Sequence, residues 1–120
     1  MSSHITVDPE AIDNLRSLCP DDGDAFLREI LNIFIDDTPA RIAELHSNRL
    51  TGDITAFVRA AHRIKGSSSN VGASELRVIA EKLELQARLH GLNGVEAIIS
   101  ELEASFARTK DELKKLISTQ

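Results

Sequence analysis

The 120-residue chain has no tryptophan or tyrosine and only four phenylalanines, so it lacks the aromatic surfaces on which single-stranded nucleic acids stack. Its single cysteine, Cys19, excludes an internal disulfide and leaves no cysteine spacing for zinc. No apolar run reaches the ~18–20 residues that span a bilayer, and the amino terminus lacks the regions of a secretory signal. We therefore expect a cytoplasmic protein that does not insert into a membrane.

Basic clusters are also missing. The net charge is −5, and no group of lysines and arginines resembles a footprint on DNA, so we expect no nucleic-acid partner. Hydrophobic residues make up 42% of the chain, an ordinary proportion for a globular protein. The length favours a single domain over residues 1–120, and residues 1–6 resemble a disordered leader.

Apolar residues recur at spacings of three and four along the whole chain, which is typical of amphipathic helices. Asp8 followed by Pro9 marks the first helix start, and Asn93 with Glu96 forms the pattern of a capping box. Pro39 predicts a kink or a division into two shorter helices. The predicted helices cover residues 8–18, 24–48, 54–71, 74–90 and 93 onward. This pattern predicts an all-α fold, an antiparallel four-helix bundle with an additional short N-terminal helix packed at one end.

One glycine lies where the helical pattern does not need it. Five of the six glycines fall near predicted helix ends, whereas Gly66 lies inside the 54–71 helix. There it costs roughly 1 kcal/mol relative to alanine. It follows His62 by four residues, so both share one helical face. We infer that another molecule must approach this face closely.

The phase of the 54–71 helix places His62 on its outer side. At about 100° per residue, the residues opposite His62 form the predicted core face. These are Phe57, Ala60, Ala61, Ile64, Ser68 and Val71. The predicted outer face carries Thr55, Val58, Arg59, Lys65, Gly66 and Ser69 around His62.

Two cations, Arg59 and Lys65, bracket the histidine on this predicted face. Placing them beside a basic ring is unfavourable unless a negative group is to lie between them. An imidazole is a competent nucleophile near neutral pH, and a phosphoryl group on one ring nitrogen would supply that negative charge. The set therefore favours phosphoryl transfer through His62, with Gly66 giving the partner's acceptor room to reach it.

The segment AHRIKGSSSNVGA, residues 61–73, resembles the signature of histidine-containing phosphotransfer (HPt) domains of bacterial two-component phosphorelays. The positions that carry the resemblance are Ala61, His62, Ile64, Lys65, Gly66, Ser67, Gly72, Ala73, Leu83 and Glu84. Isoleucine at 64 replaces the family's leucine. The opening VDPEAIDNL and the helical run from Phe26 to Leu45 extend the likeness over nearly the whole chain.

The resemblance implies that His62 accepts a phosphoryl group from an aspartate on one receiver domain and passes it to an aspartate on another. Lys65 would stabilise the phosphoryl group and Gly66 would leave space for the docked partner. Glu84 would hydrogen-bond the other ring nitrogen, or it is simply a solvated carboxylate. The partners implied are receiver domains of a hybrid histidine kinase and of a downstream regulator. The receiver is expected to supply Mg²⁺, and this chain needs no cofactor or metal of its own.

A docking patch is predicted beside the histidine. The 24–48 helix has more apolar residues than one core stripe requires. Its surplus edge at Phe26 and Ile30, extending to Ile33, together with Val58 and Ser69, forms the candidate patch. The alternative is that contacts within the bundle bury these side chains.

Other functions remain open from the sequence. The chain could be the amino-terminal phosphotransfer module of a chemotaxis-type histidine kinase, in which case its phosphate donor is an ATP-using kinase domain. It could also be a helical adaptor that is never phosphorylated, or an enzyme with His62 as general base. We expect a monomeric phosphoryl carrier, without net turnover, rather than an enzyme, because no glycine-rich phosphate loop marks an ATP site.

Overall fold

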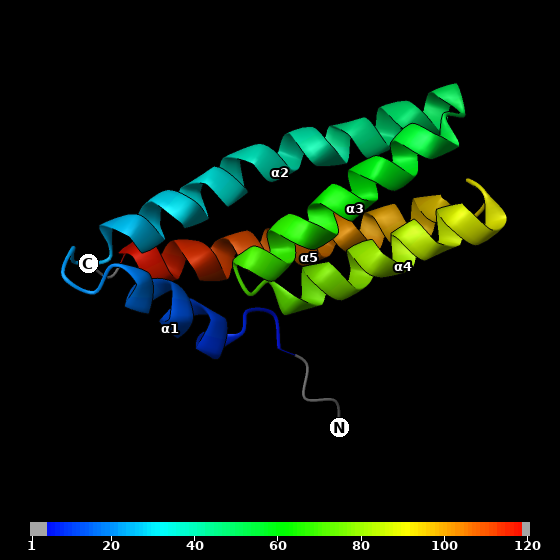
Figure 1. The fold of residues 1–120 in the computed structure, drawn as a ribbon. Helices are drawn as coiled ribbons and strands as arrows, with labels where there is room; N and C mark the ends of the chain where they lie inside the picture. The colour runs from blue at the N-terminus through cyan, green and yellow to red at the C-terminus, as the bar shows by residue number, and fades with distance from the viewer. Residues whose placement is uncertain (1–4, 119–120) are drawn as a thin grey trace.

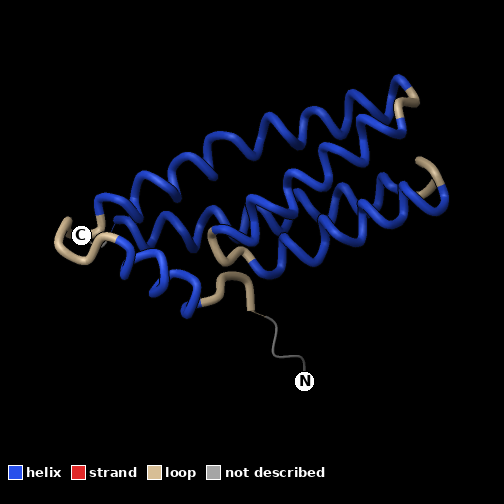
Figure 2. The backbone as a smooth tube through the Cα atoms, viewed as in Figure 1, coloured by secondary structure: helices blue, strands red, loops and turns tan. Residues whose placement is uncertain are grey.

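The computed structural model describes residues 5–118, and all regular structure within them is helical (Figures 1 and 2). The five helices are α1 (Pro9–Leu18), α2 (Ala25–Thr51), α3 (Ile54–Asn70), α4 (Ser74–His90) and α5 (Val95–Ser118). The all-α prediction is confirmed. Most of the predicted leader, residues 1–4, lies outside the described residues.

The four long helices form an antiparallel bundle. Figure 1 shows α2 and α3 joined at one end and α4 and α5 joined by a turn at the same end, while α3 and α4 meet at the opposite end. Helix α1 lies at that opposite end, close to the start of α2 and the α3–α4 turn. This arrangement confirms the predicted four-helix bundle with a short helix at one end.

Helix α1 begins where the sequence predicts and is tied to the α3–α4 turn. The side chain of Asp8 caps it by accepting a hydrogen bond from the backbone N–H of Glu10 at 3.0 Å, and Pro9 occupies the first helical position. The backbone N–H of Asp8 donates to the carbonyl of Gly72 at 2.8 Å, and Ile12 is buried in the core. The cap therefore both starts α1 and fixes it to the bundle.

Of the two alternatives predicted at Pro39, the division into two shorter helices is wrong, and the kink stays a prediction. Helix α2 continues through Pro39 as one helix, because Ile35 and Ile42 on either side of the exposed proline are both buried and hold the two halves on one core. The predicted cap at Asn93 is also wrong. Helix α5 begins at Val95, so Gly94, and not Asn93, precedes its first residue. Gly94 has a φ of 80°, and the carbonyl of Asn93 accepts a hydrogen bond from the Gln86 side chain.

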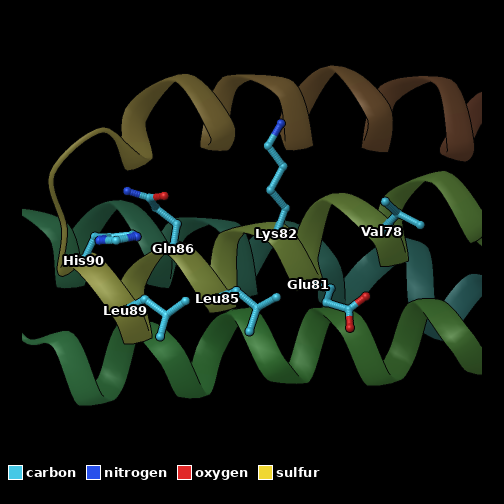
Figure 3. A pocket seen from close by; sticks show the side chains of 7 residues that line it. All are labelled: Val78, Glu81, Lys82, Leu85, Gln86, Leu89 and His90. Atoms are coloured by element: carbon cyan, nitrogen blue, oxygen red, sulfur yellow. The ribbon is translucent and has the colours of Figure 1, made fainter.

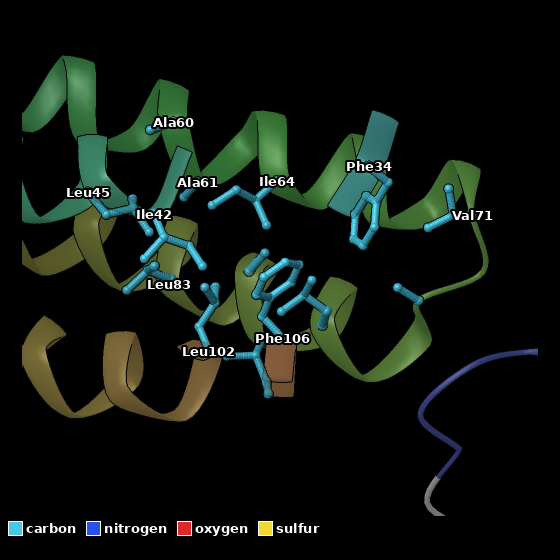
Figure 4. Close-up of a cluster of buried hydrophobic side chains, with 14 of the residues drawn as sticks. Phe34, Ile42, Leu45, Ala60, Ala61, Ile64, Val71, Leu83, Leu102 and Phe106 are labelled. Atoms are coloured by element: carbon cyan, nitrogen blue, oxygen red, sulfur yellow. The ribbon is translucent and has the colours of Figure 1, made fainter. Parts of the chain in front are cut away.

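The core is one continuous cluster that draws on all five helices (Figure 4). Phe34 of α2 and Phe106 of α5 meet edge to face with their ring centroids 6.1 Å apart. Every residue of the core face predicted for α3 is buried, from Phe57 to Val71. The phase of α3 is therefore as the sequence predicts, and it fixes which residues α3 presents outward.

A substitution at Gly72 in the α3–α4 turn tests the close contact between this turn and α1. The φ of Gly72 is 71°, and a Cβ there would lie 2.6 Å from the Cβ of Ala11 and 3.2 Å from the carbonyl oxygen of Asp8. We expect Gly72→Ala to lower the free energy of unfolding by about 2–4 kcal/mol, measured by urea denaturation. Gly52→Ala is the matched control, since its φ is 74° but no atom lies within 4 Å of its Cβ position. It should lose only roughly 1–2 kcal/mol, and equal losses in both variants would contradict this account.

Candidate functional site

His62 stands on the outer face of α3. The side chains of Ala61 and Ile64 are buried in the core. The rotation of α3 that buries them directs His62, which lies between them in the sequence, away from the core. The imidazole side chain is 61% exposed. An outside molecule can therefore reach the ring without any rearrangement of the bundle.

Glu84 of α4 holds the ring from the side of the bundle. Its neighbours Leu83 and Ala87 are buried, which sets the phase of α4, and its own side chain is only 5% exposed. Oε2 of Glu84 lies 3.1 Å from Nδ1 of His62. The orienting role that the family resemblance implies for Glu84 thus has the required geometry, and the alternative of a solvated carboxylate is wrong.

Two cations meet the same carboxylate. Nζ of Lys65 lies 3.0 Å from Oε1 of Glu84, and the guanidinium of Arg88 donates from Nη2 to Oε2 at 2.8 Å. The Lys65 side chain is 26% exposed, so part of it borders solvent. Arg88 is a site residue that the sequence reasoning missed, although its spacing of four from Glu84 on one helix is the usual signal of such a pair.

These contacts decide the charge of Glu84. Burial by itself would raise the pKa of this carboxyl, but the contacts with Arg88, Lys65 and His62 outweigh it and lower the pKa to about 2. The side chain is therefore an ionised carboxylate at neutral pH, and an ionised carboxylate can only accept hydrogen bonds.

The ionised state of Glu84 assigns the tautomer of His62. Nδ1 must carry the proton, because its partner Oε2 has none to donate. A neutral imidazole has one protonated nitrogen, so Nε2 keeps its lone pair. The ring is 61% exposed and its Nδ1 is occupied, so Nε2 is the nitrogen with a free lone pair in the neutral ring.

Packing among the described residues does not require a glycine at position 66. Gly66 lies on the exposed outer face of α3, and no atom lies within 4 Å of the position its Cβ would occupy. The fold would accept alanine there, so the cost of a helical glycine is not explained by packing. Beside it, the hydroxyls of Ser67 and Ser69 donate to the carbonyls of Ile64 and Lys65, as serines in a helix commonly do.

Arg59 lies on a different side of α3 from Lys65. It lines a groove between α2 and α3 together with Glu44 and Asn48, whereas Lys65 faces Glu84 on α4. The cation that joins Lys65 at the carboxylate is Arg88. A direct role for Arg59 at the phosphoryl site stays a prediction.

The residues of the predicted docking patch differ in exposure. Ile30 and Val58 are half-buried and pack against the core, Phe26 is half-buried, and Ile33 and Ser69 are exposed. Ile30 and Ile33 line a groove between α2 and α3 that continues to Ser67, one residue beyond Gly66. An apolar surface therefore does reach the site along α2, and its use in docking stays a prediction.

Helix α4 exposes apolar side chains that the sequence reasoning did not single out. Val78, Leu85 and Leu89 are each about half exposed or more, and they line a shallow hollow on the outer side of α4. Figure 3 shows Leu85 and Leu89 on the side of α4 nearer α3, and Lys82 and Gln86 on the side nearer α5. Leu85 directly follows Glu84 in the chain, so this surface borders the site from the other direction.

Residues 5–118 offer neither a cluster of metal ligands nor a helix suited to a bilayer. No group of three or more histidine, cysteine, aspartate or glutamate side chains gathers there in a way that could hold a metal ion. None of the helices described has both the length and the apolar character that crossing a bilayer requires.

The fold and the histidine site agree with one protein family. The family model described as "Hpt domain" matches residues 29–116, which include all of α3 and α4. The chain therefore belongs to the Hpt domain family of histidine-containing phosphotransfer proteins.

Individual relatives extend the match. The crystal structure of histidine-containing phosphotransfer protein B (HptB) from Pseudomonas aeruginosa PAO1 is 29% identical, covers 98% of this chain and 99% of that one, and has a TM-score of 0.88. Phosphorelay intermediate protein rdeA of Dictyostelium discoideum is 28% identical over 93 residues, which are 78% of this chain and 35% of rdeA. Phosphotransferase RcsD of Escherichia coli (strain K12) is 28% identical over 72 residues, which are 60% of this chain and 8% of RcsD.

The buried carboxylate predicts a pH dependence. The pKa of Glu84 is lowered in the folded state from 4.5 to about 2, so its ionised form stabilises the fold above pH 4.5. That stabilisation is lost as the pH falls towards 2, with a slope approaching about 1.4 kcal/mol per pH unit. Urea denaturation between pH 6 and 2 should therefore show a stability advantage of wild type over Glu84→Gln that shrinks on acidification.

The control for this profile is Glu81→Gln. It removes a carboxylate from the same helix, where the side chain is 45% exposed and pairs with Arg77. Its profile should run parallel to that of wild type. A constant difference between wild type and Glu84→Gln over the whole range would show that Glu84 does not titrate as described.

Proposed function

We propose that this chain is a phosphorelay intermediate that accepts a phosphoryl group on His62 from a receiver-domain aspartate and passes it to a second receiver domain. The observation that carries the proposal is the hydrogen bond from Nδ1 of His62 to the buried, ionised Glu84. In the neutral form of the exposed ring, this bond places the single proton on Nδ1 and leaves the lone pair on Nε2, which is the state that a nucleophile needs.

The transfer step follows from that protonation state. The lone pair on Nε2 of His62 attacks the phosphorus of the receiver's acyl phosphate, and a P–N bond forms. The bond from phosphorus to the aspartate oxygen breaks, and its electron pair remains on the departing carboxylate. Nδ1 keeps its proton, and the positive charge that develops on the ring faces the carboxylate of Glu84 at 3.1 Å. The reverse of the same step delivers the group to the next receiver.

The remaining demands of the step are positioning and charge. Lys65 lies one helical turn beyond His62 and its side chain is partly exposed, so its ammonium group can turn towards the phosphoryl oxygens. Mg²⁺ would come with the receiver domain and would neutralise the same oxygens from the partner's side. The chain returns to its starting state after each cycle, so it acts as a carrier without net turnover of its own.

The relatives support this role and leave the context of the chain open. All three are named for phosphorelay or phosphotransfer, yet the chain spans about a third of rdeA and less than a tenth of RcsD. We propose a cytoplasmic domain, either free-standing or the carboxyl-terminal part of a membrane-bound hybrid kinase, that meets its receivers as a monomer. A module of a chemotaxis-type kinase would differ in its donor, an ATP-using kinase domain.

The phosphoryl site is tested by labelling from a phosphorylated receiver domain. Wild type should gain a label that is acid-labile and base-stable, and His62→Gln should gain none. His46→Gln is the matched control, because His46 is also exposed and also contacts a carboxylate, Glu103 at 2.9 Å. It should be labelled like wild type.

The other outcomes separate the rival functions. Equal label on wild type and His62→Gln would move the site elsewhere. No label from several receivers, but label from an ATP-using kinase domain, would identify a kinase module. No label from either donor would favour an adaptor that is never phosphorylated.

The variant Gly66→Ala is expected to change stability and the rate of phosphoryl transfer in opposite directions. Gly66→Ala should raise the free energy of unfolding by about 0.5–1 kcal/mol, because alanine favours the helix and meets no neighbour. The same methyl group should slow transfer from the receiver, since it occupies space on the face that the partner approaches. Urea denaturation and single-turnover labelling measure the two effects, and an unchanged transfer rate would show that the glycine is not required by the docked partner.

A further inference from the structure

Oε2 of Glu84 carries two of the three contacts made by that carboxylate. It accepts from Nδ1 of His62 at 3.1 Å and from Nη2 of Arg88 at 2.8 Å, whereas Lys65 approaches the other oxygen, Oε1, at 3.0 Å. Arg88 lies four residues after Glu84 on α4, so it moves with Glu84 as part of one helix. Lys65 reaches across from α3.

The two cations differ in what they can do when a phosphoryl group arrives. A phosphoryl group brings a charge of about −1.5 to −2, and Lys65 is attached to the same helix as His62, one turn away. Its ammonium can turn from Oε1 to the phosphoryl oxygens. Arg88 already holds Oε2 from α4, the helix that carries Glu84 itself, so the carboxylate keeps a counter-charge after Lys65 has turned.

We propose that Arg88 is a positioning residue of the phosphoryl site: it anchors Glu84 against Nδ1 of His62 independently of Lys65, which leaves Lys65 free to serve the phosphoryl group. The proposal rests on the phosphorelay function proposed above. Arg88 and Glu84 on α4 then keep the proton of the ring on Nδ1. Lys65 on α3 neutralises the charge of the incoming phosphoryl group.

The tautomer of His62 in the unphosphorylated protein tests the anchoring directly. Ring ¹⁵N chemical shifts, recorded at about pH 8.5 where an unperturbed imidazole is neutral, report the fraction of Nδ1–H tautomer. Wild type and Lys65→Met should both show predominantly Nδ1–H, because Arg88 still holds the carboxylate. Arg88→Gln should show a mixture of tautomers, and Arg88→Lys should restore much of the Nδ1–H form.

Arg77→Gln is the control for charge. It removes an arginine from the same helix, one whose Nη1 lies 3.6 Å from Oε1 of Glu81, four residues further along. It should leave the tautomer unchanged. Arg88 is 56% exposed, so Arg88→Gln is expected to fold, which circular dichroism checks.

Phosphoryl uptake from a phosphorylated receiver gives the functional readout. Arg88→Gln should slow single-turnover labelling of His62 by about tenfold, the ratio that corresponds to roughly 1.4 kcal/mol of lost transition-state stabilisation. Arg77→Gln should label at the wild-type rate. Slower labelling of Arg88→Gln together with a tautomer mixture supports the proposal.

A wild-type tautomer in Arg88→Gln overturns the proposal at any labelling rate, and so does a tautomer lost in Lys65→Met but kept in Arg88→Gln. Failure of the phosphorelay function has a different signature. In that case wild type itself takes no label from the receiver, while the tautomer measurements still show whether Arg88 anchors Glu84.

Discussion

Burial of the Glu84 carboxylate between α3 and α4 sets a condition that both helices must meet. Removing a charged group from water costs several kcal/mol unless cations and hydrogen-bond donors surround it. Here α3 contributes Lys65 and His62, and α4 contributes Arg88 four residues from the carboxylate itself. A slip of α3 against α4 would separate the carboxylate from Lys65 and His62 and leave it only Arg88. The contact that orients the ring therefore also fixes the register of the two helices.

A second buried carboxylate, Glu75, joins α4 to α5. Glu75 accepts a hydrogen bond from Ser105 of α5 at 2.6 Å and pairs with Arg108 at 3.1 Å. Glu75 and Glu84 both belong to α4, and they bind α5 and α3 respectively. Helix α4 is thus held between two ionic contacts that are specific in direction, whereas the apolar core would tolerate small shifts.

Much of this arrangement could be predicted from the sequence. Helical periodicity predicted α1 and α4 within a residue, and the phase of α3 predicted both its buried face and the exposure of His62. The family motif pointed to Glu84. Arg88 was missed because its role depends on how α4 is rotated against α3, which no pattern within one helix reveals. Arg59 was paired with Lys65 by spacing alone, yet the two face different neighbours, since their positions on α3 differ by about 120° at 3.6 residues per turn.

The contacts around Glu84 also set the net charge of the site. One carboxylate with the two cations Lys65 and Arg88 gives these three side chains a net charge of +1. A phosphoryl group of about −1.5 to −2 on a ring that itself becomes cationic brings the sum close to zero. The positive charge that attracts an anionic group is therefore present before loading and is cancelled by it.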